Sequence, residues 1–194
     1  MDSLPFATAL ISTGTVALAE IGDKTQLLAL LLAARFRKPW PIIAGILVAT
    51  LANHLLAAAL GTWLTQLFDP TCLRWGLGAS FLAVALWMLR PDQVDDAGPS
   101  RVPTQLGVFG ITVLAFFLAE MGDKTQIATV MLAARYQALL VVTAGTTLGM
   151  MIANVPAVLL GERAVKVLPI AWVHRIAAAV FAAIGVAILA GLQG

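Results

Sequence analysis

Long apolar stretches, separated by short polar or proline-containing segments, follow one another along the whole chain. A helix that crosses the hydrocarbon core of a membrane needs about 20 mostly apolar residues. Six stretches reach that length: residues 6–34, 41–67, 72–90, 105–134, 139–168 and 170–192. Most prolines fall at or between the ends of these stretches, whereas Pro156 lies inside the fifth and predicts a kink there. The pattern predicts an all-α integral membrane protein with six transmembrane helices.

The composition agrees with this prediction. Of 194 residues, 60% are hydrophobic and 11% are charged, whereas a soluble domain carries about 25% charged residues. All tryptophans lie near predicted helix ends, as in an interfacial aromatic belt. The net charge of +2 and the absence of a basic run argue against nucleic acid as a partner. The single cysteine excludes an internal disulfide, and without a positive n-region after Met1 we expect no cleavable signal peptide.

The chain contains an internal repeat. The string Glu20-Ile21-Gly22-Asp23-Lys24-Thr25-Gln26 recurs as Glu120-Met121-Gly122-Asp123-Lys124-Thr125-Gln126, and further positions match, among them Asn53 with Asn154. We therefore divide the chain into a first three-helix repeat (1–90), a polar cytoplasmic linker (91–103) and a second three-helix repeat (104–194). Because three helices are an odd number, the second repeat enters the membrane from the opposite side. The prediction is a pair of inverted repeats, an arrangement that places transporter sites at the midplane.

The distribution of Lys and Arg predicts the orientation, because cytoplasmic loops are enriched in both. Eight of them lie on the linker side and two on the other. The linker side has Arg35, Arg37, Lys38, Arg90, Arg101, Arg163, Lys166 and Arg175, and the other side has Arg74 and Arg135. Both termini are therefore predicted to be non-cytoplasmic.

The repeated motif places charged side chains near the middle of the membrane, where such residues indicate a functional site. On a continuous helix, Glu20, Asp23 and Gln26 share one face about 120° wide, and Lys24 can pair with Glu20. Gly22 would then allow close approach of another helix. If the helix instead breaks at Gly22, Thr25 turns inward and backbone carbonyls become available as ligands. The sequence leaves both arrangements open, and the same applies to Gly122 and Thr125.

Together the two motifs carry four carboxylates and two lysines, so that one divalent cation would neutralise them. The predicted metal ligands are Glu20, Asp23, Glu120 and Asp123, with Lys24 and Lys124 balancing charge. Supporting residues are Gln26, Gln126, Asn53, Asn154, Thr25 and Thr125. Oxygen ligands favour Ca²⁺, Mn²⁺ or Mg²⁺, and Mg²⁺ sheds water reluctantly. Zn²⁺ or Cu⁺ would call for Cys or His, but only His54 and His174 are present, and His174 is expected at an interface. Protons compete with a metal for carboxylate oxygens, which is a physical basis for cation/proton antiport.

The doubled Glu-x-Gly-Asp-Lys-Thr motif, on the first helix of each repeat, resembles the GDT-type manganese/calcium:proton exchanger family. The resemblance covers essentially the whole chain, and the short central linker resembles that of a small prokaryotic member of the family. It implies a six-helix bundle in a prokaryotic inner membrane or thylakoid-type membrane. It also implies that Mn²⁺, or Ca²⁺ as the alternative, leaves the cytoplasm as transported substrate in exchange for H⁺. Glu20, Asp23, Glu120 and Asp123 match the family's ion-binding acids. No cofactor is implied, and the choice between monomer and homo-oligomer stays open.

Two other classes of function remain at this stage. A divalent-cation channel would use the same ligands without proton coupling. A non-transporting membrane scaffold would use Glu20–Lys24 and Glu120–Lys124 as structural ion pairs. Asn53 and Asn154 have a similar plain interpretation as hydrogen bonds between helices. An enzyme is not expected, because the chain shows neither a nucleophile–base constellation nor a phosphate-binding loop.

Overall fold

The structure, a computed structural model, describes residues 3–89, 107–161 and 170–191, and in these segments the regular secondary structure is helical. The helices are α1 (Ser3–Glu20), α2 (Lys24–Phe36), α3 (Pro39–Leu67), α4 (Pro70–Met88), α5 (Gly107–Glu120), α6 (Lys124–Tyr136), α7 (Leu139–Leu160) and α9 (Ile170–Leu189). The polar linker 91–103 lies outside the described residues, as do Arg90, Arg101, Arg163 and Lys166. The charge-based orientation therefore stays a prediction.

Four of the described helices, α3, α4, α7 and α9, are long and apolar enough to cross a membrane. Neither 6–34 nor 105–134 forms one continuous helix, because each is split into two helices at the repeated motif, a point that the sequence left open. Glycine with a positive φ interrupts both helices, as described below. The fifth predicted helix, 139–168, is helical as far as Leu160 within the described residues.

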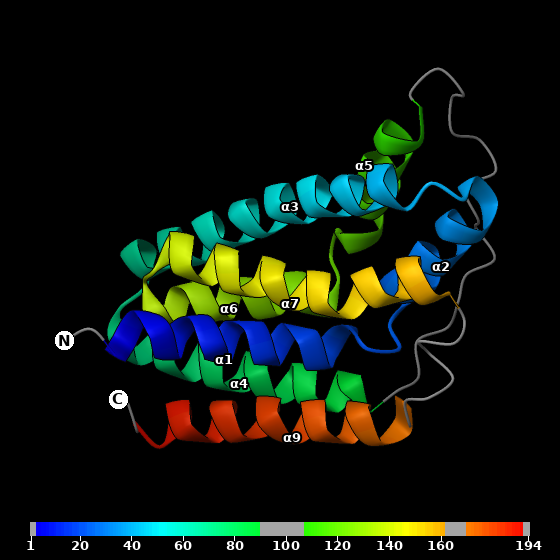
Figure 1. Cartoon of the computed structure of the whole chain (residues 1–194). Helices are drawn as coiled ribbons and strands as arrows, with labels where there is room; N and C mark the ends of the chain where they lie inside the picture. Colours follow the sequence, from blue (N-terminus) through cyan, green and yellow to red (C-terminus); the bar gives the residue numbers. More distant parts are fainter. Residues whose placement is uncertain (1–2, 90–106, 162–169, 192–194) are drawn as a thin grey trace.

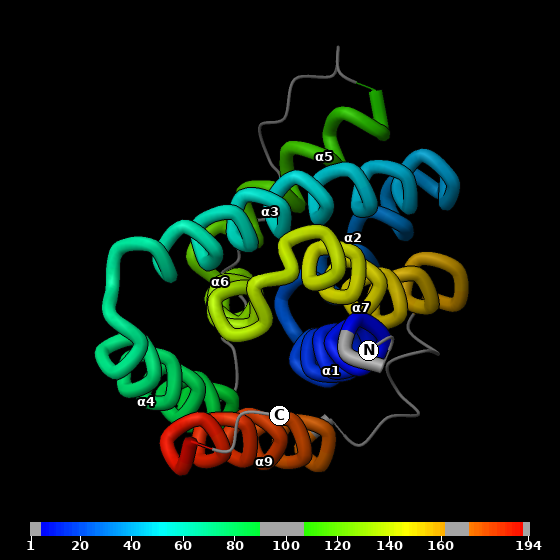
Figure 2. The backbone as a smooth tube through the Cα atoms, turned by 90° about the vertical axis from the view of Figure 1, so that its left-hand side faces the viewer, coloured from blue at the N-terminus to red at the C-terminus, as the bar shows by residue number. Residues whose placement is uncertain are grey.

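Helices from the two repeats are interleaved rather than separated. α1 packs along α7, α4 packs along α9, and α3 contacts α5, α6 and α7. In Figure 1, α3 runs from right to left whereas α7 runs from left to right, and α4 and α9 are likewise antiparallel. Viewed from the left-hand end, α6 lies inside the bundle with α3, α4 and α1 around it (Figure 2).

Glycines on α7 allow α1 to approach closely. A Cβ atom at Gly149 would lie 2.5 Å from the backbone oxygen of Thr13, and one at Gly145 would lie 2.9 Å from that of Ala9. The Thr13 hydroxyl also donates a hydrogen bond of 3.0 Å to the Gly145 carbonyl. Small residues at a helix contact let two backbones meet in a membrane, where packing drives association. This contact fixes α1, and hence the position of Glu20 at its end.

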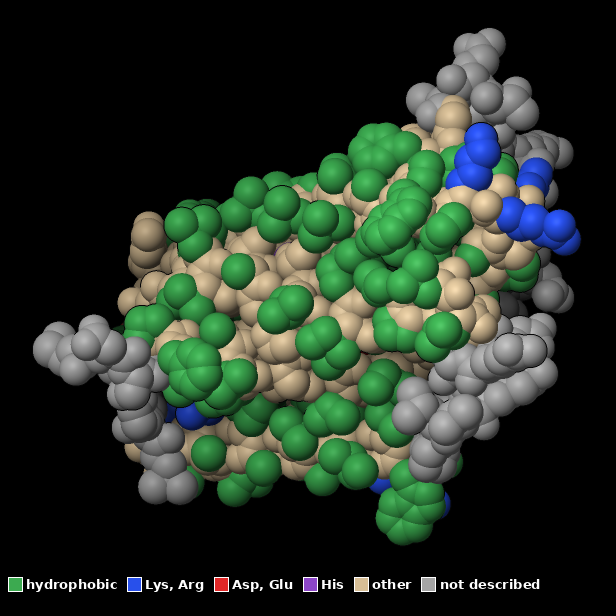
Figure 3. Space-filling model, viewed as in Figure 1, with side chains coloured by type: hydrophobic (Ala, Val, Ile, Leu, Met, Phe, Trp, Pro, Cys, Tyr) green, Lys and Arg blue, Asp and Glu red, His purple; other side chains and the backbone are tan. Residues whose placement is uncertain are grey.

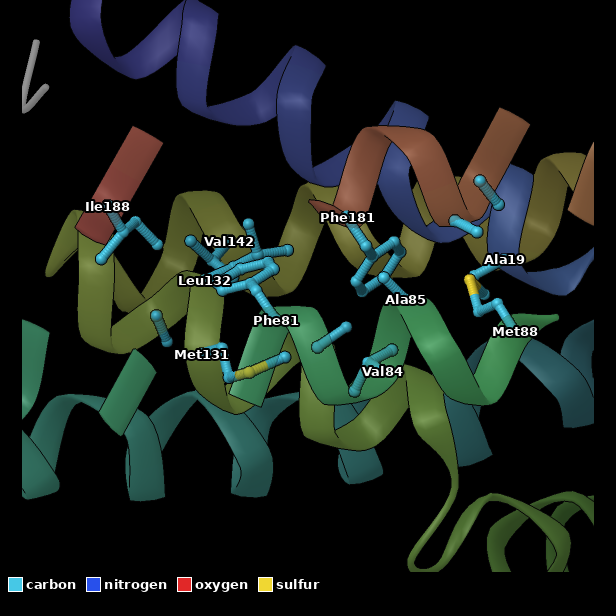
Figure 4. Packing of buried hydrophobic residues seen from close by; sticks show 14 of the residues in the cluster. Ala19, Phe81, Val84, Ala85, Met88, Met131, Leu132, Val142, Phe181 and Ile188 are labelled. Atoms are coloured by element: carbon cyan, nitrogen blue, oxygen red, sulfur yellow. The ribbon is translucent and has the colours of Figure 1, made fainter. Parts of the chain in front are cut away.

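Two apolar clusters form the core. One joins α4, α6 and α9 with parts of α1, α3 and α7, and Figure 4 shows Phe81 and Phe181 meeting at its centre. The centroids of these two rings are 5.9 Å apart. The other cluster joins α2, α3, α5 and α7 around Leu32, Ile46 and Phe116.

On the face seen in Figure 3, the sides of the bundle are largely apolar, and most of the visible Lys and Arg side chains lie at its right-hand end. The five tryptophans are all exposed and lie close to helix ends: Trp40, Trp63, Trp75, Trp87 and Trp172. Exposed tryptophans at these positions suit the boundary between hydrocarbon and headgroups. The surface is thus that of a protein surrounded by lipid.

The Gly149 contact can be tested by substitution. We expect Gly149→Ala to lower the free energy of unfolding by about 1–3 kcal/mol, because the added methyl overpacks the α1–α7 contact. Thermal unfolding in detergent measures the effect. The matched control is Gly14→Ala on α1, since a Cβ at Gly14 meets nothing within 4 Å. Equal melting temperatures for the two variants would contradict the proposed packing.

Candidate metal centre

Both copies of the motif interrupt their helix at glycine. Gly22 has φ +83° and Gly122 has φ +75°, a left-handed conformation that side chains with a Cβ rarely adopt. A Cβ at Gly122 would meet nothing within 4 Å. The backbone turn, and not close packing, therefore requires glycine at position 122. The break decides between the two arrangements that the sequence left open, and the single helix face for Glu20, Asp23 and Gln26 is wrong.

The two glutamines of the motif accept hydrogen bonds from the backbone at the helix breaks. The Gly22 N–H donates to Oε1 of Gln26 at 3.0 Å, and the Gly122 N–H donates to Oε1 of Gln126 at 2.8 Å. Gln26 also donates to the carbonyl of Ala153 on α7 at 2.9 Å. Buried N–H groups released by a helix break require such partners. Both predicted supporting glutamines thus bind protein backbone next to the acidic residues.

Three of the four predicted acids converge. Carboxylate oxygens of Glu20, Asp23 and Asp123 lie within 4.8 Å of one another, and all three residues are buried. The two threonines of the motif turn inward toward them. Thr25 donates to Oε2 of Glu20 at 2.5 Å, and Thr125 lies 2.6 Å from Oε1 of Glu20 and 3.0 Å from Oδ2 of Asp123. We call Glu20, Asp23 and Asp123 the carboxylate cluster.

Each lysine of the motif pairs with the aspartate of the other copy. Nζ of Lys24 lies 2.9 Å from Oδ1 of Asp123, and Nζ of Lys124 lies 2.6 Å from Oδ1 of Asp23. The predicted pairing of Lys24 with Glu20 within one helix is therefore wrong. That prediction assumed a continuous helix, whereas the break turns Lys24 toward the opposite repeat. Charge is balanced across the two halves of the chain.

Glu120 lies outside the carboxylate cluster among the described residues. It is fully buried, and within the described segments neither of its carboxylate oxygens accepts a hydrogen bond. Nε2 of His54 on α3 is 4.0 Å from Oε2 of Glu120, and His54 is also fully buried. The two equivalent glutamates of the repeat therefore occupy different surroundings.

The two predicted supporting asparagines, Asn53 on α3 and Asn154 on α7, form hydrogen bonds with other residues of the bundle. Asn53 donates to the carbonyl of Phe117 at 3.0 Å and accepts from Gln126 at 3.4 Å, which links α3 to α5 and α6. Asn154 donates to the carbonyl of Met150, one turn earlier on α7, at 3.1 Å. The Asn53 contacts agree with the interpretation as hydrogen bonds between helices, whereas the Asn154 contact lies within α7 and does not.

His174 on α9 belongs to the site region, although the sequence analysis gave it no role there. One of its ring nitrogens lies 3.0 Å from the carbonyl oxygen of Ile21, inside the first break. The break releases this carbonyl, and a polar side chain from a neighbouring helix satisfies it. No motif marks His174, because its position follows from the packing of α9 beside α1.

Comparison with known proteins gives a consistent result. The chain matches the family described as "Divalent cation/proton antiporter GDT1" over residues 8–96 and 108–193. It is 54% identical to a Vibrio cholerae protein named "Putative manganese exporter" over 88% of this chain and 84% of the relative. It is 33% identical to a GDT1-like protein of Synechocystis over 76% of this chain and 79% of the relative. A search of solved structures found no match. The chain is a multi-pass membrane protein that belongs to the GDT1 family of divalent cation/proton antiporters, a transporter family rather than a class of enzymes.

Proposed function

We propose that this protein moves Mn²⁺ out of the cytoplasm in exchange for protons, with Ca²⁺ as an alternative substrate. The observation that carries the proposal is the convergence of Glu20, Asp23 and Asp123 from both repeats in one buried cluster. Family membership supports divalent-cation transport, and the name of the Vibrio relative favours Mn²⁺.

The chemistry of the cluster suits a hard divalent cation. Its ligand atoms are carboxylate oxygens, with the hydroxyl oxygens of Thr25 and Thr125 beside them. Such oxygens bind Mn²⁺ and Ca²⁺ in preference to softer metals. The only thiol of the chain, Cys72, is on α4 and exposed. Glu120 would join the cluster in a second conformation of the transport cycle.

The helix ends add an electrostatic preference for cations. α1 ends at Glu20 and α5 ends at Glu120, and the C-terminal end of a helix carries a partial negative charge. Interrupted helices place such ends at the ion sites of secondary transporters. The opposite, positive ends are those of α2 and α6, where Asp23 and Asp123 occupy the N-cap positions.

The lysines act as internal counter-cations in this proposal. Lys24 and Lys124 neutralise Asp123 and Asp23 when no metal is bound, and an entering ion takes the place of an ammonium group. The side chain of Lys24 is 38% exposed, whereas that of Lys124 is 1% exposed. Lys24 is therefore the more readily displaced of the two. Protons that bind the carboxylates after metal release complete the exchange.

Alternating access would follow from six spans in two inverted three-helix repeats. The opposite directions of α3 and α7, and of α4 and α9, support this topology. Rocking of the repeats against each other would open the cluster to one side at a time. Arg35 lies in the last turn of α2, and Arg37 and Lys38 lie between α2 and α3, which supports a cytoplasmic location for that end. We place the protein in a prokaryotic inner membrane with both termini non-cytoplasmic.

The lysines should differ in their effect on stability. We expect Lys124→Met to lower the free energy of unfolding by about 3–5 kcal/mol, because it leaves Asp23 buried without its ammonium partner. Lys24→Met should cost less, about 1–3 kcal/mol, because it also leaves the buried Asp123 without its ammonium, but solvent reaches Lys24 and Thr125 still contacts Asp123. Denaturant unfolding in detergent measures both values. A larger loss for Lys24→Met would contradict the assignment.

Neutral replacements of the cluster should abolish transport without unfolding the protein. We expect Glu20→Gln and Asp123→Asn to lower Mn²⁺ uptake into proteoliposomes at least tenfold, since each removes a charged ligand. The control is Asp69→Asn at the N-cap of α4, far from the cluster, where asparagine also caps well. If the folded Glu20 and Asp123 variants transport at the wild-type rate, the cluster is a structural ion-pair network and the proposal fails.

Proton coupling separates an antiporter from a channel. In proteoliposomes with an acidic interior, we expect Mn²⁺ to accumulate above its external concentration as protons leave. Collapse of the pH gradient by an ionophore should abolish this accumulation. Uptake that only equilibrates Mn²⁺, whatever the imposed pH gradient, would identify a channel.

A further inference from the structure

A cavity of about 240 Å³ lies at the end of the bundle where α3 and α6 end and α4 begins. This end is on the left in Figure 1 and faces the viewer in Figure 2. Polar atoms from Arg74, Arg135 and Gln137 line the cavity, together with the apolar side chains of Phe68 and Leu73. It is separate from the carboxylate cluster, whose residues are not among those that line it.

The two arginines have no acidic partner among the described residues. Nε of Arg74 and Nη1 of Arg135 are buried and make no hydrogen bond there. Each guanidinium lies only over an aromatic ring next to it in sequence, at 5.8 Å for Arg74 and 5.3 Å for Arg135. The nearby acid Asp69 instead accepts hydrogen bonds from the backbone at the start of α4. Two guanidinium groups with unused donors beside one cavity suit an anion of phosphate type.

Two apolar grooves meet this cavity. Arg135 and Tyr136 also line a groove between α1 and α9, whose other lining residues are largely apolar. Phe68, Leu73 and Leu77 also line a second apolar groove, formed by α3, α4 and α6. A cationic cavity that continues into two apolar grooves has the shape and polarity of a headgroup site with two acyl-chain sites.

The depth in the membrane is appropriate for a lipid headgroup. Trp63 near the end of α3 and Trp75 near the start of α4 lie at the same end of the bundle, and both are more than half exposed. Tryptophans of this kind mark the level of the headgroups. Arginine side chains at that level can bind the phosphate of a lipid headgroup through paired N–H donors.

We propose that this end of the protein binds an anionic phospholipid. Its phosphodiester contacts Arg74 and Arg135, and its two acyl chains occupy the α1–α9 groove and the groove between α3, α4 and α6. The bound lipid joins α1 to α9 and α4 to α6, so it connects helices of both repeats. The site does not depend on the identity of the transported ion.

Native mass spectrometry of the purified full-length protein tests the proposal with three probes. These are phosphatidylglycerol, zwitterionic phosphatidylethanolamine with the same acyl chains, and inorganic phosphate. We expect phosphatidylglycerol to remain bound about 25-fold more than phosphatidylethanolamine, since each of the two arginines contributes about fivefold near an anionic membrane surface. Equal retention of the two lipids overturns the proposal. Binding of inorganic phosphate as tight as that of phosphatidylglycerol also overturns it, because the cavity would then be a site for a free anion.

The repeat provides a matched control variant. Arg74→Gln with Arg135→Gln should remove the preference for phosphatidylglycerol. The repeat-related pair, Arg35→Gln (equivalent to Arg135) with Arg175→Gln (equivalent to Arg74), removes two charges elsewhere and should preserve it. Unchanged lipid preference in the folded Arg74/Arg135 variant, or equal loss in both pairs, contradicts the site. If the double variant does not fold, Arg135→Lys is used instead, because it keeps the positive charge but lacks the paired N–H donors of the guanidinium, and it should reduce the preference for phosphatidylglycerol. The comparison of the three probes on the wild-type protein then decides whether the site binds an anionic lipid.

Discussion

Neutralisation of buried charge across the two repeats is the constraint on which the rest of this structure depends. A charged side chain in the middle of a membrane is costly unless it is paired. Lys24 pairs with Asp123, and Lys124 pairs with Asp23, so neither repeat can bury its own motif alone. The close contact of α7 with α1 and the interleaving of helices from both repeats bring the partners within reach. The two repeats must therefore pack against each other for the buried charges to be paired.

The helix breaks make this pairing possible, and they impose a second cost that neighbouring side chains offset. Irregular backbone at membrane depth is tolerated only where protein groups satisfy its N–H and C=O groups. Gln26 and Gln126 accept from the glycine N–H groups, and His174 contacts the carbonyl oxygen of Ile21. The motif therefore contains two kinds of residue: the acids other than Glu120, the lysines and the threonines face the carboxylate cluster, and a glycine and a glutamine shape the backbone around it.

The repeat, the helical class and the acidic character of the motif could be predicted from the sequence, because these depend on composition, on spacing and on the high cost of charge in an apolar run. The structure brings three of the four predicted acids together. The sequence could not predict the partner of Lys24, since the i, i+4 rule applies only to an unbroken helix. The break itself was left open, because glycine is tolerated within transmembrane helices as well as at breaks. His174 could not be assigned, because it reaches the first break from α9, about 150 positions further along the chain.

Nearly identical motifs adopt different environments in the two repeats, and this asymmetry has two origins. Glu20 accepts from two threonines, whereas Glu120 lies 4.0 Å from His54. His54 follows Asn53, whereas Val155 follows Asn154, so His54 has no counterpart in the second repeat. This difference between the two environments therefore originates in the amino-acid sequence. The unequal exposure of Lys24 and Lys124 has no such source within the motif and must come from the arrangement of the helices. An inverted pair of repeats that exchanges environments would bury Lys24, expose Lys124 and bring Glu120 toward the threonines. Under the proposed alternating access, the conformational part of the asymmetry would belong to one of two end states, and His54, which has no counterpart, would make the two states unequal in energy.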